Sequence, residues 1–298
     1  ILGVENNQVI TKQVEQIGFR TDVDKTVSEI SSAITASRAP TDIVVTVPGT
    51  MLQPTISSSD IKRLGITDLI AEGTTNFAGS PKNRIWNINR ALKQFQGLII
   101  APGEEFSFVK YLGPVDGENG YLPELVIKNN RTDPEFGGGI CQVSSTVFRA
   151  AIYAGLKITA RRNHAYPVSY YKPYGMDATI YIPNPDLKFI NNTSGSLFIQ
   201  PSISGTHLTF QMYGTNDGRI VTVDGPHILE SNPDGSMRTI FSQEVSTADG
   251  QNFIRDSFRS NYKSPSLFPH PDQEPVYTTK PKDWSGKQWE EYQRTHAR

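Results

Sequence analysis

The stretch EFGGGICQVSSTVFRAAIYAGL, residues 135–156, determines much of the predicted fold. Three consecutive glycines, Gly137 to Gly139, let the backbone turn tightly and approach another group closely, because they carry no side chain. Apolar residues then recur at helical spacing until Gly155, which supplies a C-terminal stop. The stretch therefore predicts a helix that begins near Cys141. Its apolar stripe consists of Val143, Val147, Ala151 and Ala154, with Ile140 and Phe148 beside it.

Cys141 is the only cysteine among the 298 residues, so the chain forms no internal disulfide. A thiol in the first turn of a helix lies beside unpaired amides and the positive end of the helix dipole, which lower its pKa. The thiolate is then a better nucleophile at neutral pH, and the same amides could stabilise an oxyanion during acyl transfer. The alternative interpretation is a cysteine that serves only as a small apolar side chain.

Two further side chains could complete a nucleophilic site with Cys141. A strand-like run, KITARR (157–162), leads to His164, and Asp177 opens a second strand-like run, DATIYIP. If these strands are neighbours, the three side chains converge as nucleophile, base and orienting carboxylate. Papain-like and transglutaminase-like enzymes place Cys, His and Asp or Asn in this order, which is an analogy of arrangement and not of sequence. Alternatively, His164 is a surface or capping histidine and Asp177 begins a strand through an Asx turn; Asp186 is the weaker candidate for the third position.

Polar and aromatic residues around this segment are candidates for substrate binding. Arginine holds a carboxylate in a bidentate way, and tyrosine stacks on sugar or peptide groups. Arg84, on an earlier predicted helix, joins them if that helix folds back. The alternatives are that the arginines are solvated or pair with nearby glutamates, and that the tyrosines reflect half-buried strands. The candidates are Gly138, Gly139, Gln142, Ser144, Arg161 and Tyr166.

Upstream of this segment the pattern mixes helices and strands. Residues 22–37 and 82–96 have the apolar spacing of amphipathic helices. Residues 43–47, IVVTV, indicate a strand, and residues 58–65 indicate a short helix that ends on a glycine.

Downstream the chain is predicted to be almost entirely β. Residues 189–215 indicate three strands separated by turns, and residues 219–262 indicate further short strands. From about 263 to 298 the composition becomes rich in Pro, Lys, Asp and Gln, which predicts an extended or weakly ordered tail. The expected class is α+β, with the cysteine-bearing helix packed on a mixed or antiparallel sheet.

Composition excludes several functional classes. The chain has 29 Lys and Arg against 30 Asp and Glu, a net charge of −1, which argues against a nucleic-acid partner and against electrostatic attachment to a membrane. No apolar run reaches the roughly 18 residues that a membrane helix needs, so we expect membrane attachment only through an anchor outside this chain. No nucleotide-binding or metal-binding motif occurs, and we expect neither a cofactor nor a metal.

Several blocks of the sequence resemble the VanW family, first named from vancomycin-resistance gene clusters. They are NRIWNINRALKQFQGLIIAPGEEFSF, GPVDGENGY, GGGICQVSSTVFRAAIYAGL, RRNHAYPVSYY and GMDATIYIPNPDLKFINNTSG, which occur in the family's order over about residues 74–215. The resemblance implies an exported, often membrane-anchored protein at the bacterial cell wall. The positions that match are Gly137, Gly138, Gly139, Cys141, Gln142, Ser144, Thr146, His164 and Asp177.

The resemblance also implies a division of the chain into four parts. Residues 1–72 resemble part of a peptidoglycan-binding α+β module, and residues 73–216 form the VanW-like domain. Residues 217–262 resemble a small β extension, and residues 263–298 are the extended tail.

Three functional hypotheses follow from these observations. The first is a cell-envelope enzyme, an amide hydrolase or transpeptidase, that uses Cys141 as nucleophile, His164 as base and Asp177 to orient the imidazole. The second is a non-catalytic module that binds peptidoglycan or another wall polymer. The third is a structural or assembly protein that self-associates through exposed strand edges in the β-rich C-terminal region.

Overall fold

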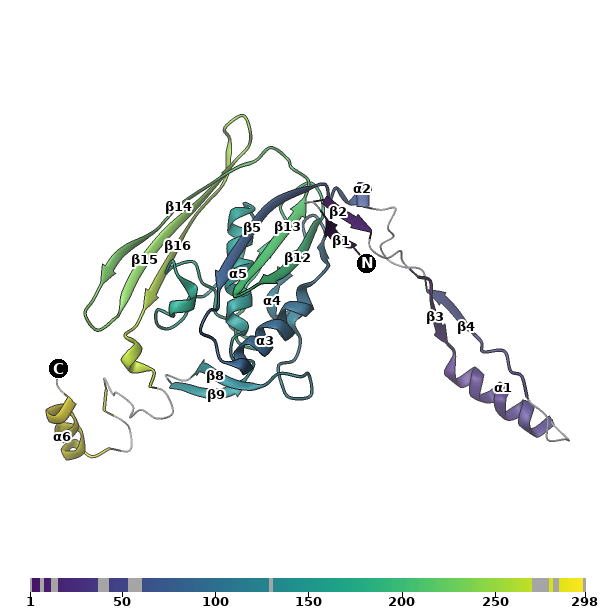
Figure 1. Cartoon of the computed structure of the whole chain (residues 1–298), viewed down its shortest axis with the longest axis horizontal. Coiled ribbons are helices and arrows are strands. Elements are labelled where there is room, and N and C mark those ends of the chain that lie inside the picture. Colours follow the sequence, from purple (N-terminus) through teal and green to yellow (C-terminus); the bar gives the residue numbers. More distant parts are fainter. Residues whose placement is uncertain are drawn as a thin grey trace. The chain divides into compact units, whose positions relative to one another are not determined.

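The chain forms two compact units, Ile1–Leu64 and Gly65–Arg298, in a computed structural model (Figure 1). The structure describes residues 2–5, 8–11, 16–36, 43–52, 61–128, 131–269, 279–280 and 284–296. The α+β class is confirmed, with several antiparallel sheets and few helices among these residues. The boundary expected after residue 72 falls inside strand β5 (Asp68–Asn76), which pairs with β13 (His207–Gly214) in the second unit.

The first unit contains two small antiparallel strand pairs and a helix. Its elements are β1 (Leu2–Glu5), β2 (Gln8–Thr11), β3 (Gly18–Thr21), α1 (Val23–Ala36), β4 (Gly49–Leu52) and α2 (Ile61–Leu64). The helix predicted over 22–37 is confirmed as α1, and the Asp22 carboxylate accepts the Lys25 N–H at 3.0 Å. Of the helix predicted over 58–65, residues 58–60 lie outside the described residues.

One expectation for the first unit was wrong. Residues 43–47 form no strand, and the strand of this region, β4, begins only at Gly49 and pairs with β3. The apolar face of α1 is not a core face, because no residue of α1 is buried. Periodicity identified the helix correctly but could not show whether a partner covers its apolar side. The exposed side chains are Val23, Val27, Ile30 and Ile34.

The second unit is built around a four-stranded antiparallel sheet. Its order is β5, β13, β12 (Leu197–Ser204) and β6 (Leu98–Ile100). A smaller sheet has the order β10 (Lys157–Ala160), β11 (Lys188–Ile190) and β7 (Glu105–Ser107), and β8 (Pro123–Lys128) pairs with β9 (Arg131–Phe136). The three strands predicted over 189–215 are confirmed as β11, β12 and β13.

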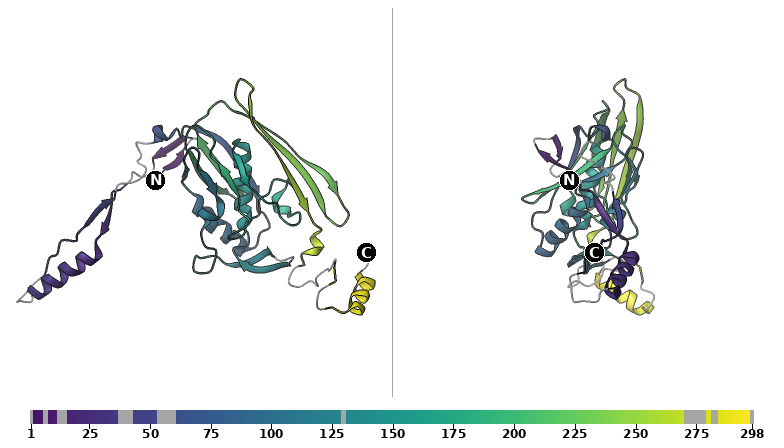
Figure 2. Two further views of the ribbon diagram at one scale, coloured as in Figure 1. Left: turned by 180° about the vertical axis from the view of Figure 1, so that it is seen from behind. Right: turned by 90° about the vertical axis from the view of Figure 1, so that its right-hand side faces the viewer.

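Helix α5 (Ile140–Tyr153) carries Cys141 and lies between two sheets of this unit. On one side β5 approaches so closely that a Cβ on Gly73 would lie 2.4 Å from the Ala150 nitrogen. On the other side Phe148 packs edge-on against Phe241 and Phe258, with ring centroids 6.1 and 5.9 Å apart. These two rings belong to a three-stranded sheet whose long strands, green to yellow, form a separate layer in Figure 2. They are β14 (Ile220–Ser231), β15 (Met237–Ser246) and β16 (Asn252–Tyr262).

Short helical elements complete the unit. The helix predicted over 82–96 is confirmed as α3 (Lys82–Leu92) followed by η2 (Lys93–Phe95). The others are α4 (Phe108–Leu112), η3 (Ser169–Tyr171) and η4 (Pro265–Leu267). The tail expected to be extended over 263–298 contains a helix, α6 (Gly286–His296), so that expectation was wrong there. Ser285 caps it, since its hydroxyl lies 2.8 Å from Gln288 Oε1 and accepts the Gln288 N–H at 3.3 Å.

The stretch DATIYIP was expected to be a strand and is not. No ladder of strand hydrogen bonds forms along it: the Thr179 N–H donates to the Arg162 carbonyl at 2.8 Å, and the backbone groups of Ala178 bond to side chains of α5. The Ala178 carbonyl accepts the Ser144 hydroxyl at 2.6 Å, and the Ala178 N–H donates to Ser145 Oγ at 3.1 Å. Likewise β10 ends at Ala160, so His164 lies in a loop and not on a strand as expected.

Candidate active site

The glycine turn before α5 places Cys141 in the first turn of the helix, as predicted. Gly139 is the N-cap residue and has a left-handed φ of 108°, which a side chain would disfavour. A Cβ on Gly138 would lie 2.7 Å from the backbone carbonyl carbon of Glu124 and the carbonyl oxygen of Leu125. The absence of side chains therefore lets β8 approach the start of α5 closely.

The Cys141 side chain is partly exposed and faces the segment that follows Asp177. Its Sγ lies 3.7 Å from the Thr179 hydroxyl and 3.7 Å from the Ile180 carbonyl oxygen. As a residue Cys141 is thus less buried than Gln142 and Ser144, which follow it on the same helix and are fully buried.

His164 and Asp177 form a buried pair, with 4% and 3% of their side chains exposed. Nδ1 of His164 lies 2.5 Å from Asp177 Oδ2, and the His164 backbone N–H donates to the same oxygen at 2.7 Å. Nε2 has no geometric hydrogen-bond partner among the described residues and is left to interact with Cys141. The structure thus brings together Cys141, His164 and Asp177, as expected.

Asp177 is fixed by two more donors on its second oxygen. Arg161 reaches Oδ1 at 3.2 Å, and the Tyr262 hydroxyl donates to the same atom. Burial alone would raise the pKa of Asp177, but the hydrogen bond and charge of His164, the charge of Arg161 and the Tyr262 hydroxyl hold it well below its ordinary range. Asp177 is therefore a carboxylate at neutral pH.

The thiol and imidazole shift each other's pKa. Burial raises the pKa of the Cys141 thiol, but the hydrogen bonding and charge of His164 outweigh burial and leave it below its ordinary value. Burial likewise lowers the pKa of His164, while Asp177 and Cys141 together raise it to about 9. The pair therefore favours a thiolate beside an imidazolium over two neutral groups.

The residues expected to bind substrate mostly hold the site together. Gln142 is fully buried, with Oε1 accepting from Arg84 at 2.8 Å and Nε2 donating to the Asn76 carbonyl at 3.4 Å. Ser144 is also fully buried and bonds to Ala178, and the Gly138 carbonyl accepts from Asn87. Their polar atoms already have protein partners.

Arg161 and Tyr166 are the two remaining candidates for substrate binding. The Arg161 side chain is 5% exposed and donates to the Asp177 and Gly175 carbonyls at 2.7 and 2.8 Å, besides its ion pair with Asp177. The half-buried Tyr166 ring packs against Phe268 with centroids 5.1 Å apart. In this structure Arg161 acts as a positioning residue.

Sequence analysis missed Tyr262 and Thr179 as parts of the site. Tyr262 lies at the end of β16, 85 residues after Asp177, and no local pattern connects the two. Asp186, the rejected candidate, is not at the site: its carboxylate accepts from Ser107 Oγ and the Val109 N–H.

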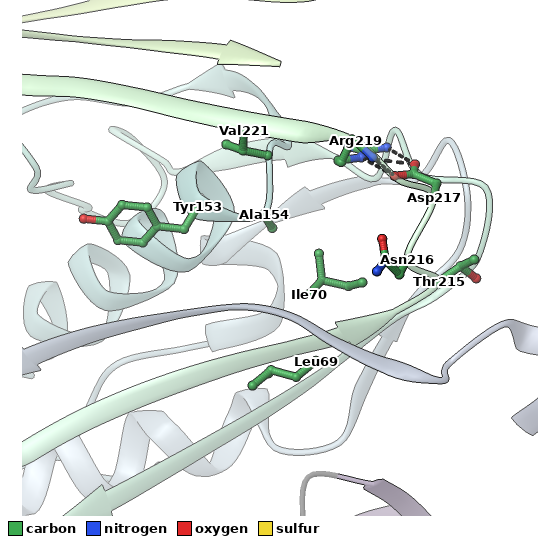
Figure 3. A pocket seen from close by; sticks show the side chains of 9 residues that line it. All are labelled: Leu69, Ile70, Tyr153, Ala154, Thr215, Asn216, Asp217, Arg219 and Val221. Carbon is green, nitrogen blue, oxygen red and sulfur yellow. Dashed lines mark hydrogen bonds and ion pairs between the residues drawn. The ribbon is translucent and has the colours of Figure 1, made fainter. Parts of the chain in front are cut away.

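A shallow pocket lies at the opposite end of α5 from Cys141 (Figure 3). Tyr153 and Ala154 at the C-terminal end of the helix line it together with Asp217 and Arg219. Arg219 pairs with Asp217 at 2.6 Å and donates to the Asn192 carbonyl at 2.9 Å, so the polar groups bond to one another and to backbone. Nothing in this pocket suggests reactive chemistry.

The described ranges contain neither a metal-binding cluster nor a membrane-spanning helix. There, no group of three or more His, Cys, Asp or Glu side chains is placed to hold a metal ion. No helix in the same ranges is both long and apolar enough to cross a membrane.

The described unit is thus an α+β domain with a Cys, His and Asp arrangement at the start of a buried helix. The family model described as VanW like protein matches residues 83–213, and for this similarity we call this part of the chain the VanW-like domain. Cys141, His164 and Asp177 all lie within the match, whereas Tyr262 lies beyond it.

Two curated proteins are similar over part of the chain. The "Uncharacterized protein YoaR" of Bacillus subtilis (strain 168) is 31% identical over 172 residues, which cover 58% of this chain and 56% of that protein. The "Vancomycin B-type resistance protein VanW" of Enterococcus faecalis (strain ATCC 700802 / V583) is 30% identical over 137 residues, which cover 44% of this chain and 50% of that protein. The chain spans about half the length of these relatives. No solved structure matches, so the analogy to papain-like and transglutaminase-like folds gains no support from comparison.

Proposed function

We propose that this chain belongs to a bacterial cell-envelope protein whose VanW-like domain is a thiol-dependent acyl-transfer enzyme acting on amide bonds of peptidoglycan or another wall polymer. The observation that carries the proposal is the buried His164–Asp177 pair, whose imidazole interacts with the Cys141 thiol. The cell-envelope setting rests on the similarity to a protein named for vancomycin resistance. The extracytoplasmic location belongs to the same proposal.

In this proposal each of the three side chains has a distinct role. The Cys141 sulfur attacks the carbonyl carbon of an amide, and the S–C bond forms as the C–N bond breaks. The His164 imidazolium gives its proton to the departing amine nitrogen, which leaves a thioester on Cys141 and a neutral imidazole. Asp177 keeps the imidazole in one orientation through Nδ1, so that Nε2 faces the reacting groups.

The second half of the reaction restores the enzyme. Neutral His164 takes a proton from a water molecule or an amine, whose oxygen or nitrogen attacks the thioester carbonyl. The S–C bond breaks, releasing an acid or a new amide and regenerating the thiolate and imidazolium. Water as acceptor gives a hydrolase, and an amine acceptor gives a transpeptidase.

The first turn of α5 is suited to stabilise the oxyanion that forms in each half of the reaction. The Ile140 and Gln142 N–H groups bond to the Gly137 and Gly139 carbonyls, while the Cys141 N–H between them has no acceptor among the described residues. The side-chain amide of Gln142 donates to the Asn76 carbonyl at 3.4 Å. The Cys141 amide and the positive end of the helix are therefore the oxyanion donors in this proposal.

The test is the alkylation of Cys141 by iodoacetamide from pH 4 to 9, on the wild-type protein and on His164→Ala. Because the chain has one cysteine, alkylation of a thiol reports on Cys141 alone. We expect the wild-type reactivity to set in well below the ordinary thiol pKa of about 8.5. In His164→Ala the cation is gone, so the thiol pKa rises and the onset moves to higher pH.

The matched control is His227→Ala, which removes an exposed histidine on β14. This variant should reproduce the wild-type profile. A wild-type thiol that reacts only after denaturation would overturn the enzymatic proposal. That result, combined with saturable binding to isolated cell walls that persists in Cys141→Ala, would instead establish a non-catalytic wall-binding module.

A further inference from the structure

Arg84 is the third residue of α3, and its buried cationic side chain packs against the first turn of α5. Arg84 is 8% exposed. Its Nη2 donates at 2.8 Å to Oε1 of Gln142, the residue that follows Cys141. The missing side chain of Gly139 makes room for it, because a Cβ there would lie 2.8 Å from Arg84 Cγ. Arg84 therefore contacts the same helical turn that carries the nucleophile.

The partners of Arg84 are neutral. Nη1 of Arg84 donates to Ser80 Oγ at 2.7 Å, and the guanidinium carbon lies 3.9 Å from the centre of the Tyr170 ring. Burial raises the pKa of the Tyr171 hydroxyl, and the nearby Arg84 charge opposes this rise. No carboxylate forms an ion pair with Arg84 in the described part of the chain.

The other two buried arginines of this region differ from Arg84. Arg161 forms an ion pair with the Asp177 carboxylate. Arg149 donates to four backbone carbonyls, those of Thr74, Tyr171, Lys172 and Met176. A buried cation is costly unless an anion or a full set of acceptors compensates it. Arg84 has neither, which leaves donors for an anionic ligand.

Tyr171 connects Arg84 to the proposed catalytic pair. The His164 and Tyr171 rings lie with centroids 4.5 Å apart, and the Tyr171 hydroxyl interacts with Arg84. His164, Tyr171 and Arg84 thus form a continuous row beside Cys141. Because Arg84 donates to the residue that follows Cys141, an anion held by Arg84 lies beside the helical turn that carries the sulfur.

We propose that Arg84 binds a carboxylate of the peptide substrate and so restricts this site to substrates with a free carboxylate near the scissile amide. The inference rests on the proposed function, since it assigns the substrate class of the same site. Guanidinium binds a carboxylate through two parallel hydrogen bonds, which fixes orientation as well as charge.

Two alkylating reagents of nearly equal size test the proposal on the folded protein. Iodoacetate carries a carboxylate and iodoacetamide does not, and both react with Cys141. We expect Arg84→Gln to lower the ratio of the iodoacetate rate to the iodoacetamide rate by about tenfold or more, since a charge-assisted bond is lost. Arg162→Gln removes an equal charge from an exposed neighbour of the site and should leave the ratio near the wild-type value.

A second measurement uses the wild-type protein alone and does not depend on a variant that folds. Three acetylated dipeptides are added as competitors of iodoacetamide: one with a free C-terminus and neutral side chains, its C-terminal amide, and an amidated one that contains glutamate. Protection by the first but not the second supports the proposal and assigns a terminal carboxylate. Protection by the third assigns a side-chain carboxylate.

The outcomes separate this inference from the proposed function. An alkylation ratio that is unchanged in Arg84→Gln, with equal protection by the free and amidated peptides, overturns the role of Arg84. The thiolate profile of Cys141 then still supports an enzyme. A thiol that is silent in the native wild-type protein overturns both.

Discussion

At the scale of single residues, the candidate site depends most on Asp177. One of its oxygens receives the His164 ring and backbone, and the other receives Arg161 and Tyr262. Four donors from three residues, in two parts of the chain, therefore converge on one buried carboxylate. Such convergence fixes the imidazole, which is what a general acid and base requires.

Replacing Asp177 by Asn should affect both stability and thiol chemistry. The change leaves Arg161 buried without its anion, which we expect to cost about 3–5 kcal/mol of unfolding free energy. It also removes the charge that holds the proton on His164, so the pKa of His164 falls and that of the Cys141 thiol rises. Urea denaturation and the pH profile of iodoacetamide alkylation measure the two effects.

Asp186→Asn is the matched control for this prediction. Asp186 is a buried carboxylate that accepts hydrogen bonds from Ser107, Val109 and Leu187, away from the thiol. Its replacement should cost about 1–3 kcal/mol and leave the alkylation profile unchanged. Identical profiles for the Asp177 and Asp186 variants would remove Asp177 from the mechanism.

The stabilising contribution of Asp177 also depends on pH. Its pKa in the folded protein lies below the ordinary value of about 3.9. The contribution is therefore fully present above that pH and is lost as the pH falls and the carboxylate is protonated.

At the scale of elements, the turn between β9 and α5 positions the nucleophile. Gly138→Ala should destabilise the domain by about 1–3 kcal/mol, because its Cβ would lie within 3 Å of the β8 backbone, which cannot move as a flexible side chain could. The melting temperature should fall, and the thiol profile should shift if the first turn of α5 is displaced. Gly286→Ala, where nothing lies within 4 Å, is the control. Equal melting temperatures for the two variants would contradict the close approach.

The elements also show how far sequence reasoning reaches. Helix α5 and its glycine turn could be predicted because their signals are local. The order of Cys, His and Asp along the chain suggested that these three side chains meet. The conformation of the segment after Asp177 could not, because alternation indicates an extended chain but not its hydrogen-bond partner. Here Ser144 and Ser145 of α5 supply those bonds, and a serine on a helix gives no sign of this in sequence.

At the scale of the whole molecule, the second unit extends beyond the family match at residue 213. The aromatic rings of β15 and β16 pack on Phe148 of α5, and Gln243 donates to the Ile152 carbonyl at 2.7 Å. The region expected to be a separate β extension therefore shares a core with the VanW-like domain. Sequence could not show this, because a contact between residues about 90 positions apart has no local signature.

Tyr262→Phe tests whether the C-terminal sheet supports the site. The hydroxyl accepts the Gly175 N–H at 2.8 Å and donates to Asp177, so the variant leaves both groups without this partner while keeping the ring. We expect a loss of about 1–3 kcal/mol in unfolding free energy and a slower reaction of Cys141 at neutral pH, since Asp177 and His164 are less firmly held. Tyr213→Phe is the control, because its hydroxyl bonds only to Gln211 within the four-stranded sheet among the described contacts. Equal stability and equal thiol reactivity in the two variants would show that β16 covers the domain without supporting its chemistry. A selective loss in Tyr262→Phe would make the sheet beyond residue 213 part of the functional unit.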